Sequence, residues 1–146
     1  MIETVIFDSV NKPAASKKEE IVDFLYTNLE EYGDEKKDIT KCMDYAFKEF
    51  ESFGGFAMIL EEDSKIKGAV IVNQTGMGGY IPENILVYIA THKEHRGEGL
   101  GKKLMTAAIA NTKDDVALHV EANNPAKMLY EKFGFTNPYL EMRLKK

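Results

Sequence analysis

Apolar and polar residues recur along the chain with two periods, and these periods predict its helices and strands. Short alternating or fully apolar runs are typical of strands, and they occupy residues 2–7, 56–61, 66–73, 83–91, 116–122 and 139–144. Apolar residues three and four apart are typical of one helix face, and they occupy residues 16–32, 39–50, 100–110 and 125–133. The predicted order is β-α-α-β-β-β-α-β-α-β, an α+β fold with a sheet of mixed direction.

Cap and turn residues set the expected ends of several elements. Ser16 and Glu19 have the spacing of a capping box at the start of the first helix. Pro125 stands in the first turn of the last helix, where its missing N–H is no loss. Gly134 follows that helix at the position where a left-handed glycine often ends one. The run 83–91 is apolar almost throughout, so we expect it to be central in the sheet.

Composition narrows the class of protein. The chain has 146 residues, which is enough for one core, so residues 1–146 are expected to form a single domain. It has no run of eighteen apolar residues and no basic segment followed by an apolar one at its start, so neither a membrane span nor a signal peptide is expected. Cys42 is the only cysteine, which favours a reduced, cytoplasmic setting. The formal net charge of −5 argues against nucleic acid as a partner.

The most informative stretch is residues 95–103, which read His-Arg-Gly-Glu-Gly-Leu-Gly-Lys-Lys. It connects the predicted strand 83–91 to the predicted helix 100–110. Glycine lets backbone N–H groups come close to a ligand, and the first turn of a helix offers unbonded N–H groups and a positive dipole end. The stretch therefore predicts a site for a phosphate or pyrophosphate.

Three known phosphate-binding patterns can be compared with this stretch. A Walker A loop ends in Gly-Lys-Ser/Thr, but here Lys103 follows Lys102, so the magnesium-binding hydroxyl is missing. A dinucleotide fingerprint needs Gly-x-Gly-x-x-Gly, whereas Gly97, Gly99 and Gly101 are each two residues apart. The third pattern, Gln/Arg-x-x-Gly-x-Gly/Ala, fits residues 96–101 at every fixed position.

That third pattern resembles the acyl-CoA pyrophosphate loop of the GNAT superfamily of N-acetyltransferases. Residues 118–135 are similar to the family's second cofactor segment, because they read as a strand, an Asn, and a helix that carries Leu-Tyr-Glu and ends in Gly-Phe. The resemblance covers residues 56–144, and the first fifty residues match in pattern only. It implies a single-domain GNAT fold, with a mixed, mostly antiparallel sheet of about six or seven strands, about four helices, and splayed central strands.

The resemblance implies acetyl-CoA as the acyl-donor substrate and assigns residues to it. The pyrophosphate would be bound by the backbone N–H groups of Gly97, Gly99, Leu100 and Gly101. Arg96 and Lys102 would add positive charge. Ile89 and Thr91 would offer backbone groups to the pantetheine arm. Asn124 would contact the same arm, because Asn-Pro-Ala opening a helix is the family's usual form, although a one-residue shift would give Asn123 and Asn also caps helices well. No His, Cys or Asp cluster has metal-ligand spacing, so no metal site is expected.

Transfer of an acyl group from a thioester to an amine requires a proton for the departing thiolate and a route for the amine's proton. Tyr130 falls on the family's tyrosine, the usual general acid, and core packing is its alternative role. For the general base, the family often places a Glu where this chain has Ile85. Glu83 lies two residues earlier, on the same side of the strand. His119, Glu121 and an ordered water are the alternatives.

The resemblance thus implies an N-acetyltransferase that moves an acetyl group from CoA to a primary amine by direct transfer. Both a small-molecule amine and a protein amine fit as the acceptor, because fold and cofactor do not identify it. The alternative is a GNAT-like module that binds acyl-CoA as a sensor or interaction surface without turnover. Neither nucleic acid nor a membrane is expected as a partner. Dimers are common in the family, so the resemblance allows a homodimer.

Overall fold

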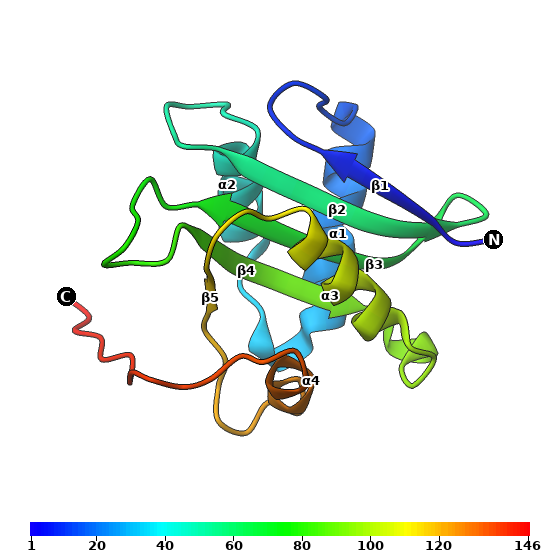
Figure 1. Cartoon of the computed structure of the whole chain (residues 1–146). Coiled ribbons are helices and arrows are strands. Elements are labelled where there is room, and N and C mark those ends of the chain that lie inside the picture. Colours follow the sequence, from blue (N-terminus) through cyan, green and yellow to red (C-terminus); the bar gives the residue numbers. More distant parts are fainter.

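The apolar runs of the sequence form one five-stranded sheet with helices on both faces (Figure 1). The computed structural model describes residues 1–146. Along the chain its elements are β1 (Glu3–Phe7), α1 (Ala15–Leu29), the 3₁₀ helix η1 (Glu30–Tyr32), α2 (Lys36–Ala46), β2 (Gly55–Glu62), β3 (Lys65–Gln74), β4 (Asn84–Thr91), the 3₁₀ helix η2 (Lys93–His95), α3 (Leu100–Ala110), β5 (Val116–Leu118) and α4 (Lys127–Lys132).

The strand order in the sheet is β1-β2-β3-β4-β5, so every strand lies beside its neighbour in the sequence. The first three pairings are antiparallel and the last, between β4 and β5, is parallel. A parallel neighbour needs a crossover, and α3 supplies it on one face of the sheet (Figure 1). The prediction of a mixed, mostly antiparallel sheet is confirmed.

Alternation along the strands sorts the core into two layers. Ile59 and Ile71 belong to the layer under α1 and α2, whereas Leu60 and Val70 belong to the layer under α3 and α4. Since helices cover both faces, β2 and β3 are buried on both sides, which explains their continuous apolar runs. No helix is both long and apolar enough to cross a bilayer.

The first two helices begin earlier than the sequence predicts. The helix α1 starts at Ala15, and its N-cap, Ala14, makes no side-chain cap hydrogen bond, so the predicted Ser16–Glu19 capping box is wrong. Ala14 has an extended conformation after Pro13, which lets the first helical turn form before Ser16 is reached. The helix α2 runs from Lys36 to Ala46 rather than from 39 to 50, and Lys48 just after it has a φ of +56° that no helix tolerates.

The predicted strand at residues 139–144 is wrong, and the sheet has five strands rather than six or seven. The large apolar side chains of this segment are exposed, between 81% and 92% of their surface. The predicted strand 116–122 keeps only Val116–Leu118. Because β5 is so short, no ladder lies alongside the C-terminal segment to take up its backbone hydrogen bonds, and the segment runs out from α4 unpaired (Figure 1).

The splay predicted for the central strands falls instead between β4 and β5, the fourth strand and the edge strand of the sheet. Their pairing joins Asn84 to Val116, Ile85 to Ala117 and Leu86 to Leu118, and it ends there. The strand β4 continues for five more residues, 87–91, which pair only with β3. The sheet therefore opens at the C-terminal half of β4, and residues 87–91 are called its open stretch below.

Gly55 offers a test of the β2–β3 packing. A Cβ placed on Gly55 would lie 2.2 Å from the Val72 carbonyl oxygen and 2.6 Å from Asn73 Oδ1. We expect Gly55→Ala to lower the free energy of unfolding by about 2–3 kcal/mol, because backbone atoms cannot move aside as side chains can. Urea unfolding measures this. Gly68→Ala is the control, since its nearest atom is the end of the Leu104 side chain at 3.3 Å; equal stability of the two variants would contradict the packing.

Candidate active site

The glycine turn, residues 97–101, connects η2 to α3 in a conformation that few other residues adopt. Gly97 and Gly99 have φ values of +87° and +80°, and no atom lies within 4 Å of where their Cβ atoms would be. Gly99 is the N-cap of α3 and the helix has no side-chain cap. The first N–H groups of α3 are therefore without a side-chain acceptor, at the positive end of the helix dipole. This geometry suits an anion.

Gly101 has a packing role that the sequence pattern alone did not reveal. A Cβ on Gly101 would lie 3.3 Å from Leu129 Cδ2 and 3.9 Å from Thr91 Cγ2. The start of α3, the end of β4 and the body of α4 therefore meet at this glycine. The contact brings two segments that are separated in the sequence, residues 91–101 and 127–132, to one place.

The open stretch of β4 presents backbone groups on the side that β5 has left. The N–H of His92 donates to the Lys67 carbonyl oxygen at 2.9 Å, so His92 is bonded toward β3. Backbone groups alternate in direction along a strand. The N–H and C=O groups of Ile89 and Thr91 consequently point to the opposite side, where no strand is paired with β4. The family resemblance implies free backbone groups at those two residues, and their role toward a ligand stays a prediction.

Tyr130 lies on α4, next to the Leu129 that meets Gly101. It is 7% exposed and packs in the core layer with Leu86 and Leu100, and its ring meets Phe135 edge-on at 6.1 Å. Burial raises the pKa of the Tyr130 phenol to about 12. The hydroxyl is therefore protonated at neutral pH, as a general acid must be before it acts, and the buried ring also fits the packing role.

Asn124 closes the turn that leads into α4. Its Oδ1 accepts a hydrogen bond from the Ala126 N–H at 2.9 Å, and its own N–H donates to the Glu121 carbonyl oxygen at 2.9 Å. The side-chain bond makes an Asx turn ahead of α4, whose N-cap is Ala126 and which has no side-chain cap. The bond uses only the side-chain oxygen, so the amide Nδ2 of Asn124 is still a donor for another group.

The three candidate bases lie on either side of the short β4–β5 ladder, Glu83 before it and His119 and Glu121 after it. Glu83 precedes the first residue of β4, and its Oε1 accepts a hydrogen bond from the Asp115 N–H at 3.3 Å. The three β4–β5 pairs stand between Glu83 and the open stretch, so the structure does not bring Glu83 together with the glycine turn. His119 and Glu121 are exposed and follow β5 directly, where it parts from β4.

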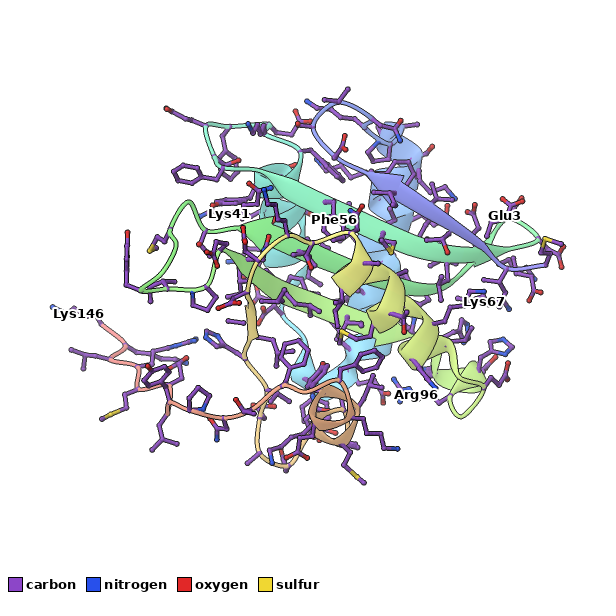
Figure 2. All side chains as sticks on the ribbon, viewed as in Figure 1. Glu3, Lys41, Phe56, Lys67, Arg96 and Lys146 are labelled. Carbon is purple, nitrogen blue, oxygen red and sulfur yellow. The ribbon has the colours of Figure 1, made fainter.

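The two cationic side chains of the motif are placed differently. Lys102 is exposed in the first turn of α3. The Arg96 guanidinium donates to the Glu30 carboxylate at 3.0 Å and to the Asn28 carbonyl oxygen at 2.8 Å. Figure 2 labels Arg96 at the turn that precedes α3. The predicted phosphate ligand Arg96 is thus engaged with the C-terminal end of α1.

An acidic hollow lies where α1 passes through η1 into α2, and the sequence did not predict it. Its volume is about 690 Å³, and its lining residues are Tyr26, Thr27, Glu30, Gly33, Asp34, Glu35 and Asp38. The buried Tyr88 of β4 donates to Asp34 at 2.5 Å. Tyr32 of η1 donates to the Asn123 carbonyl oxygen at 3.2 Å, so η1 reaches the loop before α4. The run of carboxylates around Gly33 was the available signal in the sequence.

Comparison with protein families gives one match across the site. Residues 54–137 match the family model of the acetyltransferase (GNAT) domain, which is more than half of the chain. The chain is 31% identical over 84 residues to 5-NmdU N-acetyltransferase of Pseudomonas phage PaMx11, covering 56% of this chain and 58% of that protein. It is 31% identical over 85 residues to N-alpha-acetyltransferase 30 of Schizosaccharomyces pombe, covering 55% and 57%. The chain spans a little over half the length of these relatives.

Solved structures share the fold at low identity. An aminoglycoside N-acetyltransferase, AAC(6′)-Iy in complex with CoA, superposes with a TM-score of 0.70 at 11% identity and covers 100% of this chain and 95% of its own. PH1933 from Pyrococcus horikoshii OT3 superposes with a TM-score of 0.68 at 23% identity, covering 96% and 93%. At such identities the likeness establishes the fold, and the residues of the site rest on the geometry above.

The buried phenol predicts how stability depends on pH. Because the pKa of Tyr130 is raised to about 12 in the folded chain, against about 10 when unfolded, its contribution is complete below pH 10 and is lost as the pH rises toward 12. We expect wild-type protein to lose about 1 kcal/mol more than Tyr130→Phe between pH 8 and pH 11. Urea unfolding at both pH values measures the difference, and parallel losses would show that the phenol is not desolvated.

Proposed function

Because the chain belongs to the GNAT acetyltransferase family, we propose that it moves an acetyl group from acetyl-CoA to a primary amine by direct transfer. The observation that carries the proposal is the meeting of three features at Gly101. The uncapped glycine turn, the open stretch of β4 and the helix that holds Tyr130 all come together there. We take residues 1–146 as one catalytic domain.

The geometry supports a place for each part of the donor. The diphosphate would accept hydrogen bonds from the N–H groups of the glycine turn, where the two left-handed glycines leave the backbone accessible. Lys102 would add a positive charge in the first turn of α3. The pantetheine arm would pair with Ile89 and Thr91 as a short extra strand, since those backbone groups have no partner from β5. Tyr130 would then lie near the sulfur.

The chemistry requires one bond to form and one to break. The neutral amine nitrogen attacks the thioester carbonyl carbon, the C–S bond breaks, and the sulfur leaves as a thiol once Tyr130 gives it a proton. A backbone N–H of the open stretch would stabilise charge that develops on the carbonyl oxygen. The amine's proton leaves through water or through His119 or Glu121, which follow β5 at the mouth of the opening.

Two observations support a positively charged nitrogen acceptor. Both relatives that match in sequence are named N-acetyltransferases, which supports nitrogen as the attacking atom. The acidic hollow contributes four carboxylates beside η1, and such a cluster of one sign raises the local concentration of cations. An acceptor that carries charge in addition to the reacting amine fits both observations.

The position of Glu83 favours a second candidate, an acyl-CoA-binding sensor or interaction module without turnover. The position that aligns with the family's glutamate is Ile85, and Glu83, two residues earlier, accepts a hydrogen bond from the Asp115 N–H away from the open stretch, so the general base falls to exposed residues or to water. Thermal-shift measurement with CoA, followed by thiol release from acetyl-CoA with a panel of primary amines, separates the two functions. Stabilisation with turnover supports the enzyme. Stabilisation without turnover on any amine supports the sensor.

Removal of the Tyr130 hydroxyl tests the general acid. We expect Tyr130→Phe to lower kcat by about 100-fold or more while the Kd for acetyl-CoA from calorimetry changes little, because the proton is needed mainly in the transition state. Tyr139→Phe is the matched control, since Tyr139 is 85% exposed in the C-terminal segment. An unchanged kcat in Tyr130→Phe would leave Tyr130 with the packing role alone.

The glycine turn is tested by pairing two glycines of the same conformation. Gly99 and Gly79 both have positive φ and no neighbour within 4 Å of a Cβ, but only Gly99 belongs to the turn. We expect Gly99→Val to weaken CoA binding at least tenfold in calorimetry, because a branched side chain would fill the space of the ligand. Gly79→Val carries the same backbone strain and should bind CoA normally. Equal binding by both variants would place the diphosphate elsewhere.

A further inference from the structure

We infer that Arg96 is a positioning residue for the amine acceptor: it fastens the end of α1 and so sets one wall of the acidic hollow, rather than holding the diphosphate. The inference rests on the proposed function, because it assigns a part in the same transfer reaction. The motif implies that an arginine at this position adds charge for the pyrophosphate. The inference differs from that role because the guanidinium is hydrogen-bonded to Asn28 and Glu30.

Three hydrogen bonds join the segment before the glycine turn to the end of α1. Asn28 Oδ1 accepts from the Lys93 N–H at 2.9 Å. Arg96 donates from Nη2 to the Asn28 carbonyl oxygen at 2.8 Å and from Nη1 to Glu30 Oε1 at 3.0 Å. The Asn28 side chain is 4% exposed and its Nδ2 donates to the Phe24 carbonyl oxygen at 2.9 Å. The attachment is therefore anchored in the buried face of the helix.

The attachment matters because α1 ends there in an unfavourable conformation. Glu30 has a φ of +55°, which costs a residue other than glycine free energy, and it begins the η1 turn that carries Tyr32. The carbonyl of Asn28 is one of the last of α1, and such carbonyls lack partners within the helix. The guanidinium donates a hydrogen bond to that carbonyl and pairs with the carboxylate of Glu30. Arg96 thereby stabilises the backbone conformation in which α1 ends and the wall of the hollow begins.

The same contact sets the charge of the hollow. Glu30 is one of its four carboxylates, and Arg96 neutralises it at the rim. Asp34 accepts from the Tyr88 hydroxyl, and Glu35 pairs with Lys37 at 3.5 Å across an exposed surface. We therefore expect loss of Arg96 to change both the wall and the charge of the acceptor side, because its hydrogen bonds go to Asn28 and Glu30 and not to the glycine turn.

Kinetics with the wild-type chain and four variants decide whether Arg96 positions the acceptor side or binds the diphosphate of CoA. We expect Arg96→Gln and Arg96→Lys to raise KM for the amine about three- to tenfold, since a lysine keeps the charge but not the two-pronged geometry. KM and Kd for acetyl-CoA should change less than about twofold. Lys102→Gln should show the reverse pattern. Arg143→Gln, the same change at the chain's other arginine, should alter neither KM.

Hydrogen exchange gives a readout that does not need turnover. We expect Arg96→Gln to speed amide exchange in residues 28–33 and to leave residues 100–105 as in the wild type. Glu30→Gln removes only the carboxylate contact, so its effect on KM for the amine should be smaller, and the double variant should be no worse than Arg96→Gln alone. Rescue of KM by lysine at position 96 would show that charge alone is used, and would overturn the positioning role.

The outcomes distinguish this inference from the proposed function. A wild-type chain that binds no CoA in calorimetry contradicts the proposed function, and exchange in residues 28–33 still decides whether Arg96 fastens α1. A wild-type chain that binds CoA and acetylates an amine, with Arg96→Gln weakening acetyl-CoA tenfold and leaving the amine KM unchanged, restores Arg96 to the diphosphate and overturns the inference. Unchanged exchange in residues 28–33 of Arg96→Gln overturns it as well.

Discussion

The early end of the pairing between β4 and β5 is the constraint on which the candidate site depends. Three parallel residue pairs bring the strands together, and the next five residues of β4 have no neighbour on that side. A full ladder would use the backbone groups of Ile89 and Thr91 and would leave no room between β4 and α4. Buried backbone groups need partners, so this stretch is a place where a ligand or water must complete the sheet.

The rest of the molecule holds that opening in shape. On its other side β4 is bonded along its length to β3, which is buried on both faces. The helices α1 and α2 press on one face of the sheet and α3 on the other, as Figure 1 shows. The opening is consequently framed by rigid elements, and only its mouth is made of loops. Loops over a rigid sheet are where binding residues commonly lie.

How much of this was readable from the sequence depends on the range of the interactions involved. The glycine turn was predictable because left-handed glycines before a helix are a local feature, and the strand 83–91 was predictable because its residues are buried or half-buried in alternation and nearly all apolar. The strand at 139–144 was not, because alternation describes a side-chain pattern and says nothing of a neighbouring ladder. Arg96 was misleading for a related reason: its motif position is local, whereas its partners at Asn28 and Glu30 are 68 and 66 residues away.

The short β4–β5 ladder affects which part of the molecule unfolds locally. Residues 116–146 are joined to the rest by three strand pairs, the Tyr32–Asn123 bond and the packing of Tyr130 and its apolar neighbours in the core layer under α3. With so few backbone bonds, this segment is the natural candidate for a separate cooperative unit, which opens at a lower free energy than the sheet. A ligand that contacts both the sheet and the C-terminal segment would raise the free energy of that opening by mass action. The two would then unfold together as one cooperative unit.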